Sequence, residues 1–299
     1  MRLSGFSFAR NAMKLGYPLR EALLSILPIV DELVVVVAPG DPDDDTRGLV
    51  ESIGDERVRI IDTVWDDRRR QRIYADLTNV ALDACGGDWC LYVQADEVLH
   101  EDDLETVRGR CEELLADARV HGLLFDYLHF FGDYHHLQTG HGWYRREIRI
   151  VRNGVGVRSV RDAQSFRFAD ESRITVAPAQ TRIFHYGWVR DPRTMQAKVQ
   201  EFWRHRRSAE EVAAEFGGTG AFDYGPLGRL ARYRGTHPRV MADRIAAMNW
   251  SEQLREVDPP GMRRPPHRDE RPTFRLLSAI SRLSGVDLNH TNHGRVLKV

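Results

Sequence analysis

Two adjacent carboxylates, Asp96 and Glu97, follow the apolar segment at residues 89–93 after two intervening residues. The length and composition of this segment are typical of a strand that is buried on both faces of a parallel sheet. Ligands of open α/β sheets bind at the carboxyl ends of such strands, and two carboxylates there can hold a divalent cation against a phosphorylated substrate. A strand that ends in two solvated acids has the same pattern, so the spacing leaves both interpretations open.

Strand and helix patterns alternate around these acids. Apolar runs predict strands at residues 3–8, 33–38, 58–62 and 89–93. Apolar residues with helical spacing predict helices at residues 19–27, 46–53, 73–84 and 104–115. This order predicts an α/β fold with a mostly parallel central sheet that is flanked by helices.

The patterns change in the second half of the chain. Further strands are predicted at residues 122–130, 146–152, 174–176 and 182–186, and a last helix at residues 274–283. After residue 194 the sequence becomes helical and basic. We therefore expect an α/β domain at residues 1–195 and a helical, basic extension at residues 196–299, with a Pro/Arg-rich linker at residues 259–272.

The composition limits the classes of partner and compartment. The 299 residues include 43 basic and 44 acidic side chains, so no overall field favours nucleic acid as a partner. The three cysteines fit no zinc or redox spacing, and we expect them to be buried thiols in a reducing compartment. The first residues lack the apolar core of a signal peptide, and no apolar run has the length of a membrane span. These observations predict a cytoplasmic protein.

Two local features invite other interpretations. Basic residues cluster at residues 204–207 and 229–239, which leaves peripheral contact with a membrane surface open beside the commoner explanation of solvated helix faces. His135, His136 and His141 lie close together in the sequence, but their spacing is not that of a standard zinc site.

Five segments carry a resemblance to a known family. They lie at residues 6–12, 31–35, 88–97, 143–149 and 184–189 and read Phe-Ser-Phe-Ala-Arg-Asn-Ala, Asp-Glu-Leu-Val-Val, Asp-Trp-Cys-Leu-Tyr-Val-Gln-Ala-Asp-Glu, Trp-Tyr-Arg-Arg-Glu-Ile-Arg and Phe-His-Tyr-Gly-Trp-Val. In this order they resemble the family-2 type of GT-A-fold glycosyltransferases, in a bacterial subgroup with Gln-Ala-Asp-Glu in place of the usual Asp-x-Asp. The resemblance covers about residues 3–190 and implies the GT-A fold.

The resemblance also implies an activity. Such enzymes are hexosyl- or related transferases, which move a sugar from a nucleotide-diphosphate donor to a hydroxyl acceptor with inversion and with a divalent cation, Mn²⁺ or Mg²⁺. By its match to the last acid of the family motif, Asp96 would bind the metal directly. Glu97 is a second candidate ligand. His185 matches the downstream histidine that often closes the metal site, and an imidazole ligand would favour Mn²⁺.

The residues that would bind the nucleotide-sugar donor match the family pattern less closely. Asn11 matches a polar residue of the first loop near the nucleotide. Gln94 replaces the first acid of the motif, although its amide can still form a hydrogen bond with a ribose hydroxyl. From its place on a strand, Arg149 is a candidate for a bidentate contact with phosphate, although a solvated strand face is the commoner explanation. The acids that usually contact the base have moved toward the next helix, at residues 41–45.

The acceptor side is expected to hold the base catalyst and the sugar. Inversion requires a group that takes the proton of the attacking hydroxyl, and Asp162 matches the family position, although a turn aspartate is the other explanation. Trp143, Tyr144 and Trp188 are candidates for stacking on a sugar ring, and core packing explains them equally well.

Two competing functions stay open. The replacement of an acid by Gln94 leaves open a non-catalytic module that binds nucleotide sugars. A sugar nucleotidyltransferase would need a glycine-rich, basic phosphate loop after the first strand, and residues 7–11 contain no glycine.

Overall fold

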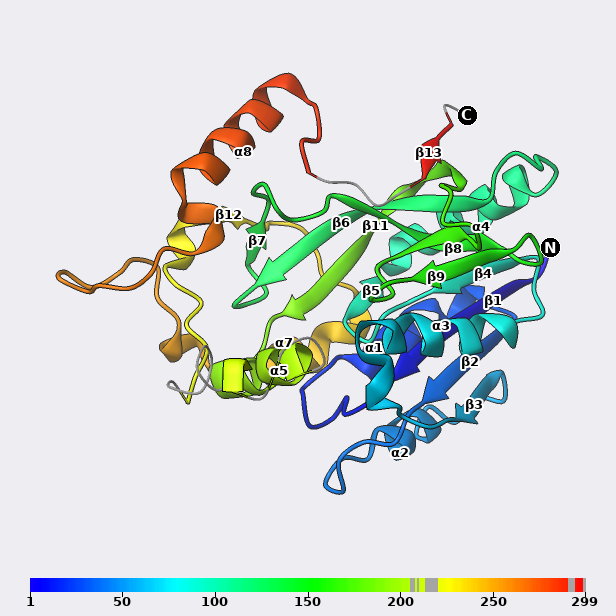
Figure 1. Cartoon of the computed structure of the whole chain (residues 1–299), viewed down its shortest axis with the longest axis horizontal. Coiled ribbons are helices and arrows are strands. Elements are labelled where there is room, and N and C mark those ends of the chain that lie inside the picture. The colour runs from blue at the N-terminus through cyan, green and yellow to red at the C-terminus, as the bar shows by residue number, and fades with distance from the viewer. Residues whose placement is uncertain (205–207, 209, 213–219, 290–293, 298–299) are drawn as a thin grey trace.

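Four parallel strands form the first half of a central sheet. The structure, a computed structural model, describes residues 1–204, 208, 210–212, 220–289 and 294–297. The parallel strands follow the order β3 (Val58–Asp62), β2 (Glu32–Val37), β1 (Leu3–Ala9) and β4 (Trp89–Tyr92). The predicted α/β class is confirmed, and the acidic motif begins directly after β4 (Figure 1).

Helices cover both faces of these strands. On one face, α1 (Leu19–Ile26) and α4 (Leu104–Leu114) pack on a core that includes Val35, and on the other α3 (Ile73–Asp83) packs on a core that includes Val34. Successive side chains of a strand point to opposite faces, so the valine-rich β2 is buried on both sides. The short helix α2 (Thr46–Glu51) follows β2, and Asp45 caps its first turn by accepting a hydrogen bond from the Gly48 backbone.

The sheet is mixed beyond β4. There β8 (Arg146–Arg152) is antiparallel to β4 and to β6 (Gly122–Phe131), and β7 (His136–Gln138) is antiparallel to β6. The predicted mostly parallel order describes the first four strands, and the rest of the sheet contains both parallel and antiparallel pairs. A separate hairpin of β9 (Val157–Val160) and β10 (Ser165–Phe168) packs on the α3 face.

One long strand replaces two predicted short ones. β11 (Thr175–Trp188) spans both predicted segments and runs parallel to β6, with an irregularity between Pro178 and Arg182. Pro178 has no backbone N–H and Gln180 has a positive φ of 61°, so the chain bulges there instead of ending the strand. Sequence periodicity is interrupted at this bulge, which explains the prediction of two strands.

The pairing of β11 sets the positions of several polar residues. β5 (Glu97–Leu99) is antiparallel to β11 and places Glu97 opposite His185, while β6 places His129 beside His185. The Tyr186 backbone N–H also donates to the carbonyl of Asp96 at 2.8 Å. The acidic motif is thus joined by backbone hydrogen bonds to a segment almost 90 residues later in the chain.

The C-terminal part of the chain packs on this sheet. It contains α5 (Pro192–Arg204), α7 (Ala242–Ala246), α8 (Pro272–Ser284) and the short strands β12 (Ala231–Arg232) and β13 (Arg295–Val296), which pair with β7 and β11. Short 3-10 helices lie at Leu27–Ile29, Asp67–Arg72, Glu101–Asp103, Leu227–Arg229, Arg239–Met241, Ser251–Gln253 and Arg268–Glu270. The expected domain boundary after residue 195 falls within α5, so the division remains a prediction. Among the described residues, none of the helices combines the length and the apolar character needed to cross a membrane.

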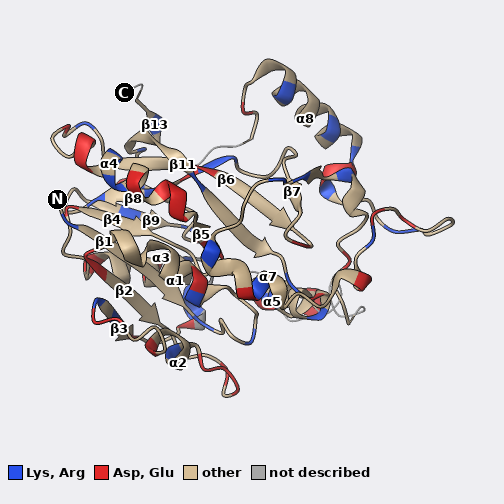
Figure 2. Ribbon diagram, turned by 180° about the vertical axis from the view of Figure 1, so that it is seen from behind, with Lys and Arg blue, Asp and Glu red and all other residues tan. Residues whose placement is uncertain are grey.

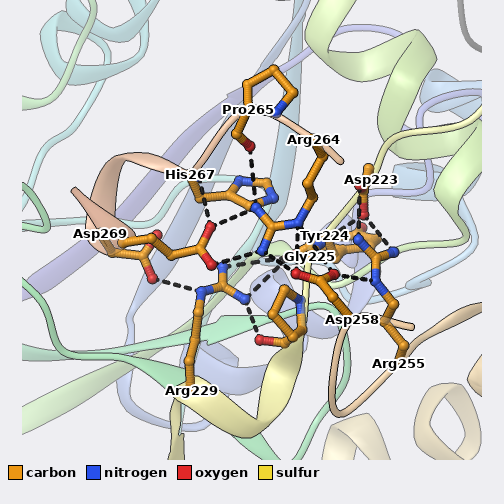
Figure 3. Close-up of polar contacts among 12 residues, drawn as sticks. Asp223, Tyr224, Gly225, Arg229, Arg255, Asp258, Arg264, Pro265, His267 and Asp269 are labelled. Atoms are coloured by element: carbon orange, nitrogen blue, oxygen red, sulfur yellow. Dashed lines mark hydrogen bonds and ion pairs between the residues drawn. The ribbon is translucent and has the colours of Figure 1, made fainter. Parts of the chain in front are cut away.

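An ion-pair network anchors the predicted linker at residues 259–272. Arg264 donates to the carboxylates of Asp258 and Glu270, and Arg255 donates to Asp258 and Asp223 (Figure 3). The hydrogen bonds from Arg264 lower the pKa of Glu270 to about 2. The network therefore fixes this segment of the chain in a definite position just before α8.

The basic clusters found in the sequence are largely paired. Arg229 donates to Asp269, Arg232 to Glu256, and Arg239 lies 3.7 Å from Glu101. Residues 205–207 of the other basic cluster lie outside the described residues. Arg232 and Arg239 remain largely exposed, so peripheral membrane contact through this cluster stays a prediction.

Candidate active site at the end of strand β4

Asp96 and His185 face one another beside a glycine. Asp96 is 7% exposed, and its Oδ1 lies 3.9 Å from Nε2 of His185. A Cβ atom on Gly187 would lie 2.5 Å from Nε2 of His185 and 2.8 Å from Oδ2 of Asp96, far closer than such atoms approach one another. Any larger residue at this position would collide with both side chains, so Gly187 allows the backbone to pass close to Asp96 and His185.

Two cations border the same carboxylate. Nζ of Lys198, on α5, lies 3.2 Å from Oδ2 of Asp96 and 2.6 Å from the carbonyl of Gly187, to which Arg190 also donates. Burial would raise the pKa of Asp96, but the positively charged groups around it, Lys198 foremost and Arg190 among them, together outweigh this effect and hold that pKa well below its usual range. Burial and the charge of Arg190 lower the pKa of Lys198 to about 7. Asp96 is therefore ionised, with Oδ2 paired to Lys198 and Oδ1 turned toward His185.

A hydrogen-bonded pair of histidines fixes the tautomer of His185. Nε2 of His129 lies 2.7 Å from the carbonyl of Tyr144, and the two Nδ1 atoms of His129 and His185 are 2.9 Å apart. Burial lowers the pKa of His129 to about 4 and that of His185 well below its usual range, so both rings are neutral at pH 7. Because a carbonyl only accepts, His129 carries its proton on Nε2 and its Nδ1 accepts from Nδ1–H of His185. The lone pair of His185 is left on Nε2, the atom nearest Asp96.

Glu97 has a different environment from its neighbour. Both oxygens bind Arg149 at 2.7 Å, and both side chains are fully buried. Tyr127 donates to Oε1 at 2.7 Å and the backbone of Gln94 donates to Oε2 at 3.1 Å. These bonds leave Glu97 no oxygen for a metal and Arg149 no exposed group for a phosphate. We therefore withdraw the predicted roles of Glu97 as a metal ligand and of Arg149 as a donor-binding residue.

Gln94 connects the acidic motif to the turn that carries Asp162. Its side-chain amide donates to the carbonyl of Ala163 at 3.1 Å, a bond that a carboxylate is unable to make because it has no N–H. Arg161 and Ala163 both have positive φ values, 58° and 60°, so the turn around Asp162 is sharp. Asp162 is partly exposed and lines a small pocket between β9 and β10.

The three aromatic candidates lie together. Trp143 packs edge-on against Trp188 at 5.8 Å between ring centroids, and both contact Phe131. Tyr144 and Trp143 each pack on the ring of His129, at 4.5 and 5.1 Å. Trp143, Tyr144 and Trp188 are partly exposed. The structure thus brings the predicted sugar-stacking residues to the histidine pair beside Asp96.

Asn11 lies near a separate cleft at the ends of β2 and β3. It is 1% exposed, and its side-chain oxygen accepts from the backbone of Asp41 at 2.7 Å. The cleft has a volume of about 190 Å³ and is lined by residues that include Gly40, Thr46 and Asp62. Asn11 therefore shapes the loop at the edge of this cleft, and its side-chain oxygen already accepts a hydrogen bond within the protein.

Several residues of the site were not predicted from the sequence. Lys198, Arg190 and His129 all border the pair formed by Asp96 and His185. Lys198 follows the buried Met195 by three positions and so shares a face of α5 with it, which is a signal that the sequence did contain. The histidine pair depends on the register of β6 and β11 and has no local sequence signal.

The metal-binding capacity of the site is limited to two side chains. Within the described ranges, no three His, Cys, Asp or Glu side chains gather closely enough to form a metal site by themselves. Oδ1 of Asp96 and the lone pair of His185 Nε2 form a mixed oxygen and nitrogen pair, which the backbone of Gly187 approaches closely. This pair fits a divalent cation whose remaining ligands are substrate phosphates and water.

Comparisons with known proteins give only distant likenesses. No protein-family model and no curated protein matches the chain. The crystal structure of S. aureus TarS is 16% identical, with a TM-score of 0.41, over 72% of this chain and 43% of that one. Glucosyl-3-phosphoglycerate synthase from Mycobacterium tuberculosis, solved with Mn²⁺ and UDP, is 18% identical, with a TM-score of 0.31, over 42% of this chain and 44% of that one. The chain spans less than half of either structure, and likenesses of this size leave its activity open.

Replacing Glu97 by Gln separates a structural role from a metal-binding one. The variant leaves Arg149 buried without its charge partner, and we expect a loss of about 3–5 kcal/mol in the free energy of unfolding, measured with urea. The double variant Glu97→Gln with Arg149→Met should recover part of this loss. Unchanged stability with weaker Mn²⁺ binding would instead restore Glu97 as a ligand.

Glu147 is a buried acid that the sequence did not single out. It is 1% exposed, Gln164 donates to its Oε1 at 2.9 Å, and its Oε2 has no partner among the described residues. Burial raises its pKa to about 7. Between the unfolded value of 4.5 and pH 7 the folded chain therefore binds a proton that the unfolded chain has released.

The pH dependence of stability should reveal this proton. The contribution of Glu147 is fully present below about pH 4.5 and is lost as the pH rises through about 7. The difference in the free energy of unfolding between the wild type and Glu147→Gln should shift by about 2–3 kcal/mol against the wild type from pH 5 to pH 8. Urea unfolding at several pH values measures this difference, and a pH-independent difference would contradict the assignment.

Proposed function

We propose that the chain is an inverting, metal-assisted glycosyltransferase of the GT-A fold, which moves a sugar from a nucleotide-diphosphate donor to a hydroxyl acceptor. The observation that carries the proposal is the convergence of Asp96 and His185, beside the glycine at position 187, at the carboxyl end of a parallel strand. The ordered sequence resemblance supports the same conclusion. Three free, buried cysteines support a reducing, cytoplasmic location.

Asp96 and His185 would hold the divalent cation. The imidazole favours Mn²⁺ over Mg²⁺, and a bound cation stabilises the negative charge of the leaving diphosphate. Lys198 keeps Oδ2 of Asp96 occupied and turns the other oxygen toward His185. Its ammonium also adds positive charge on the side where the diphosphate would lie.

The donor nucleotide would enter the cleft beyond β2 and β3. The volume of about 190 Å³ is smaller than the roughly 300–1,000 Å³ of a complete ligand pocket, so the cleft suits one part of the donor, such as the base. Asn11 contributes indirectly, through the loop that it bonds at Asp41. Gln94 also contributes indirectly, because its side-chain amide bonds the turn that carries Asp162.

The acceptor would bind on the aromatic side. Trp143, Tyr144 and Trp188 offer ring faces and edges for a sugar. The acceptor oxygen attacks the anomeric carbon, the bond to the diphosphate breaks, and the proton of the hydroxyl passes to Asp162 as general base. The hydrogen bond from Gln94 to Ala163 connects the turn that carries this base to the acidic motif.

Two variants divide the proposed roles. With a panel of nucleotide sugars and Mn²⁺, the wild type should release free nucleoside diphosphate from one donor. Asp96→Asn should weaken Mn²⁺-dependent donor binding, while Asp162→Asn should keep donor binding and lower transfer at least about 100-fold, the lower range for a general base. Donor binding is followed by calorimetry and release by a coupled assay.

The other outcomes are also informative. Donor binding without release, with any acceptor or with water, would identify the chain as the non-catalytic binding module instead. Unchanged turnover in Asp162→Asn would remove the base assignment.

His129 should act on metal binding through His185. His129→Leu removes the acceptor of the His185 Nδ1 proton, and we expect Mn²⁺ affinity to fall about 10–100-fold, as for other groups that orient a ligand. His129→Gln can both donate to Tyr144 and accept from His185, so it should bind Mn²⁺ more tightly than the Leu variant. Paramagnetic resonance of free Mn²⁺ measures both, and equal affinities in all three proteins would contradict this role.

A further inference from the structure

The last long helix, α8, turns apolar side chains toward solvent. Leu276, Ile280 and Leu283 are 62%, 43% and 89% exposed. Their spacing of four and then three residues places them in one stripe along the helix. Val286, just after the Gly285 cap, is 55% exposed and extends the apolar surface.

The opposite face of α8 attaches the helix through serines. Ser278 accepts a hydrogen bond from the backbone of His141 at 2.7 Å, and the buried Ser281 accepts one from Arg145 at 2.9 Å. An ordinary surface helix packs its apolar stripe on the protein and exposes its polar face. The inner face of α8 also carries Phe274, whose ring lies 5.4 Å from that of His141, but the apolar stripe points away from it. Packing among the described residues therefore does not account for the exposed stripe.

The charge on α8 has a single sign. Arg275 and Arg282 are exposed, lie seven residues apart and therefore share one side of the helix next to the stripe. The helix contains no acidic residue (Figure 2). The nearest acids before it, Asp269 and Glu270, are bonded to Arg229 and Arg264. The nearest acid after it, Asp287, is partly buried and accepts hydrogen bonds from Asn289. A partner of α8 must therefore cover aliphatic side chains and also supply negative charge.

We propose that α8 docks this protein on an anionic lipid surface. An interfacial helix buries an aliphatic stripe at the boundary between headgroups and acyl chains, while arginines beside the stripe meet lipid phosphates. A second copy of the chain is less suitable, because two α8 helices packed by their stripes would bring arginines together without acids. The proposal does not depend on the proposed enzymatic function.

The attachment of α8 gives this docking a consequence for the site. The bonds of Ser278 and Ser281 go to residues 141 and 145, and Trp143 and Tyr144 lie between these positions. A membrane bound by α8 would therefore lie on the side of the molecule that carries these aromatic residues. Figure 1 shows α8 at the edge of the molecule away from the parallel strands β1–β3.

Vesicle co-sedimentation of the full chain tests the proposal. We expect binding to vesicles of phosphatidylcholine with phosphatidylglycerol, weaker binding to phosphatidylcholine alone, and weaker binding as salt is raised. Arg275→Gln with Arg282→Gln should weaken binding to the anionic vesicles about thirtyfold. Leu276→Gln with Leu283→Gln should weaken binding to both kinds of vesicle at least about tenfold.

A matched control and two adverse results complete the test. Val64 is 77% exposed and follows β3, away from α8, so Val64→Gln should bind like the wild type. Because the exchanged side chains are exposed, thermal unfolding should be unchanged in all variants. Absence of binding to anionic vesicles at low salt would overturn the proposal. A dimer that the Leu276 and Leu283 exchanges dissociate would also overturn it, in favour of a second copy.

Discussion

The buried ion pair between Glu97 and Arg149 joins the parts of the sheet that surround the candidate site. Glu97 begins β5, Arg149 belongs to β8 and Tyr127, which donates to the same carboxylate, belongs to β6. Removing two charges from water is costly, and such a pair is tolerated only when its remaining hydrogen-bonding groups are satisfied. Because Glu97 is also opposite His185 in the strand register, the pair fixes the distance from the acidic motif to β11.

The two neighbouring acids, Asp96 and Glu97, therefore have different roles. Glu97 bonds only to groups within the protein, whereas Asp96 faces a histidine, a lysine and the backbone of a glycine. Lys198 reaches this carboxylate from α5, so the helix that follows β11 closes the site from another side. The carboxylate of Asp96 is therefore held in one orientation by the hydrogen-bonding groups around it.

Local patterns predicted most of the elements, and long-range pairing determined the rest. The valine run of β2 and the helical spacing of α3 are visible in any short window of the sequence. The bulge in β11, the short β5 and the contact of His129 with His185 depend on partners far away in the chain. For α8 the two faces could be read from the sequence, but not which of them meets the protein. Asp96 and His185 were brought together as expected, whereas Glu97 and Arg149 paired with each other because both became fully buried.

The hydrogen bond from Gln94 to Ala163 has a consequence for how this sequence can vary. An acid at position 94 would repel the carbonyl that the amide now binds, and it would add a second negative charge next to Glu97. The turn at residues 161–163, with its two residues of positive φ, is therefore compatible with an amide at position 94 and not with an acid. Across related chains, the identity of residue 94 should therefore change together with the identities of residues 161–163.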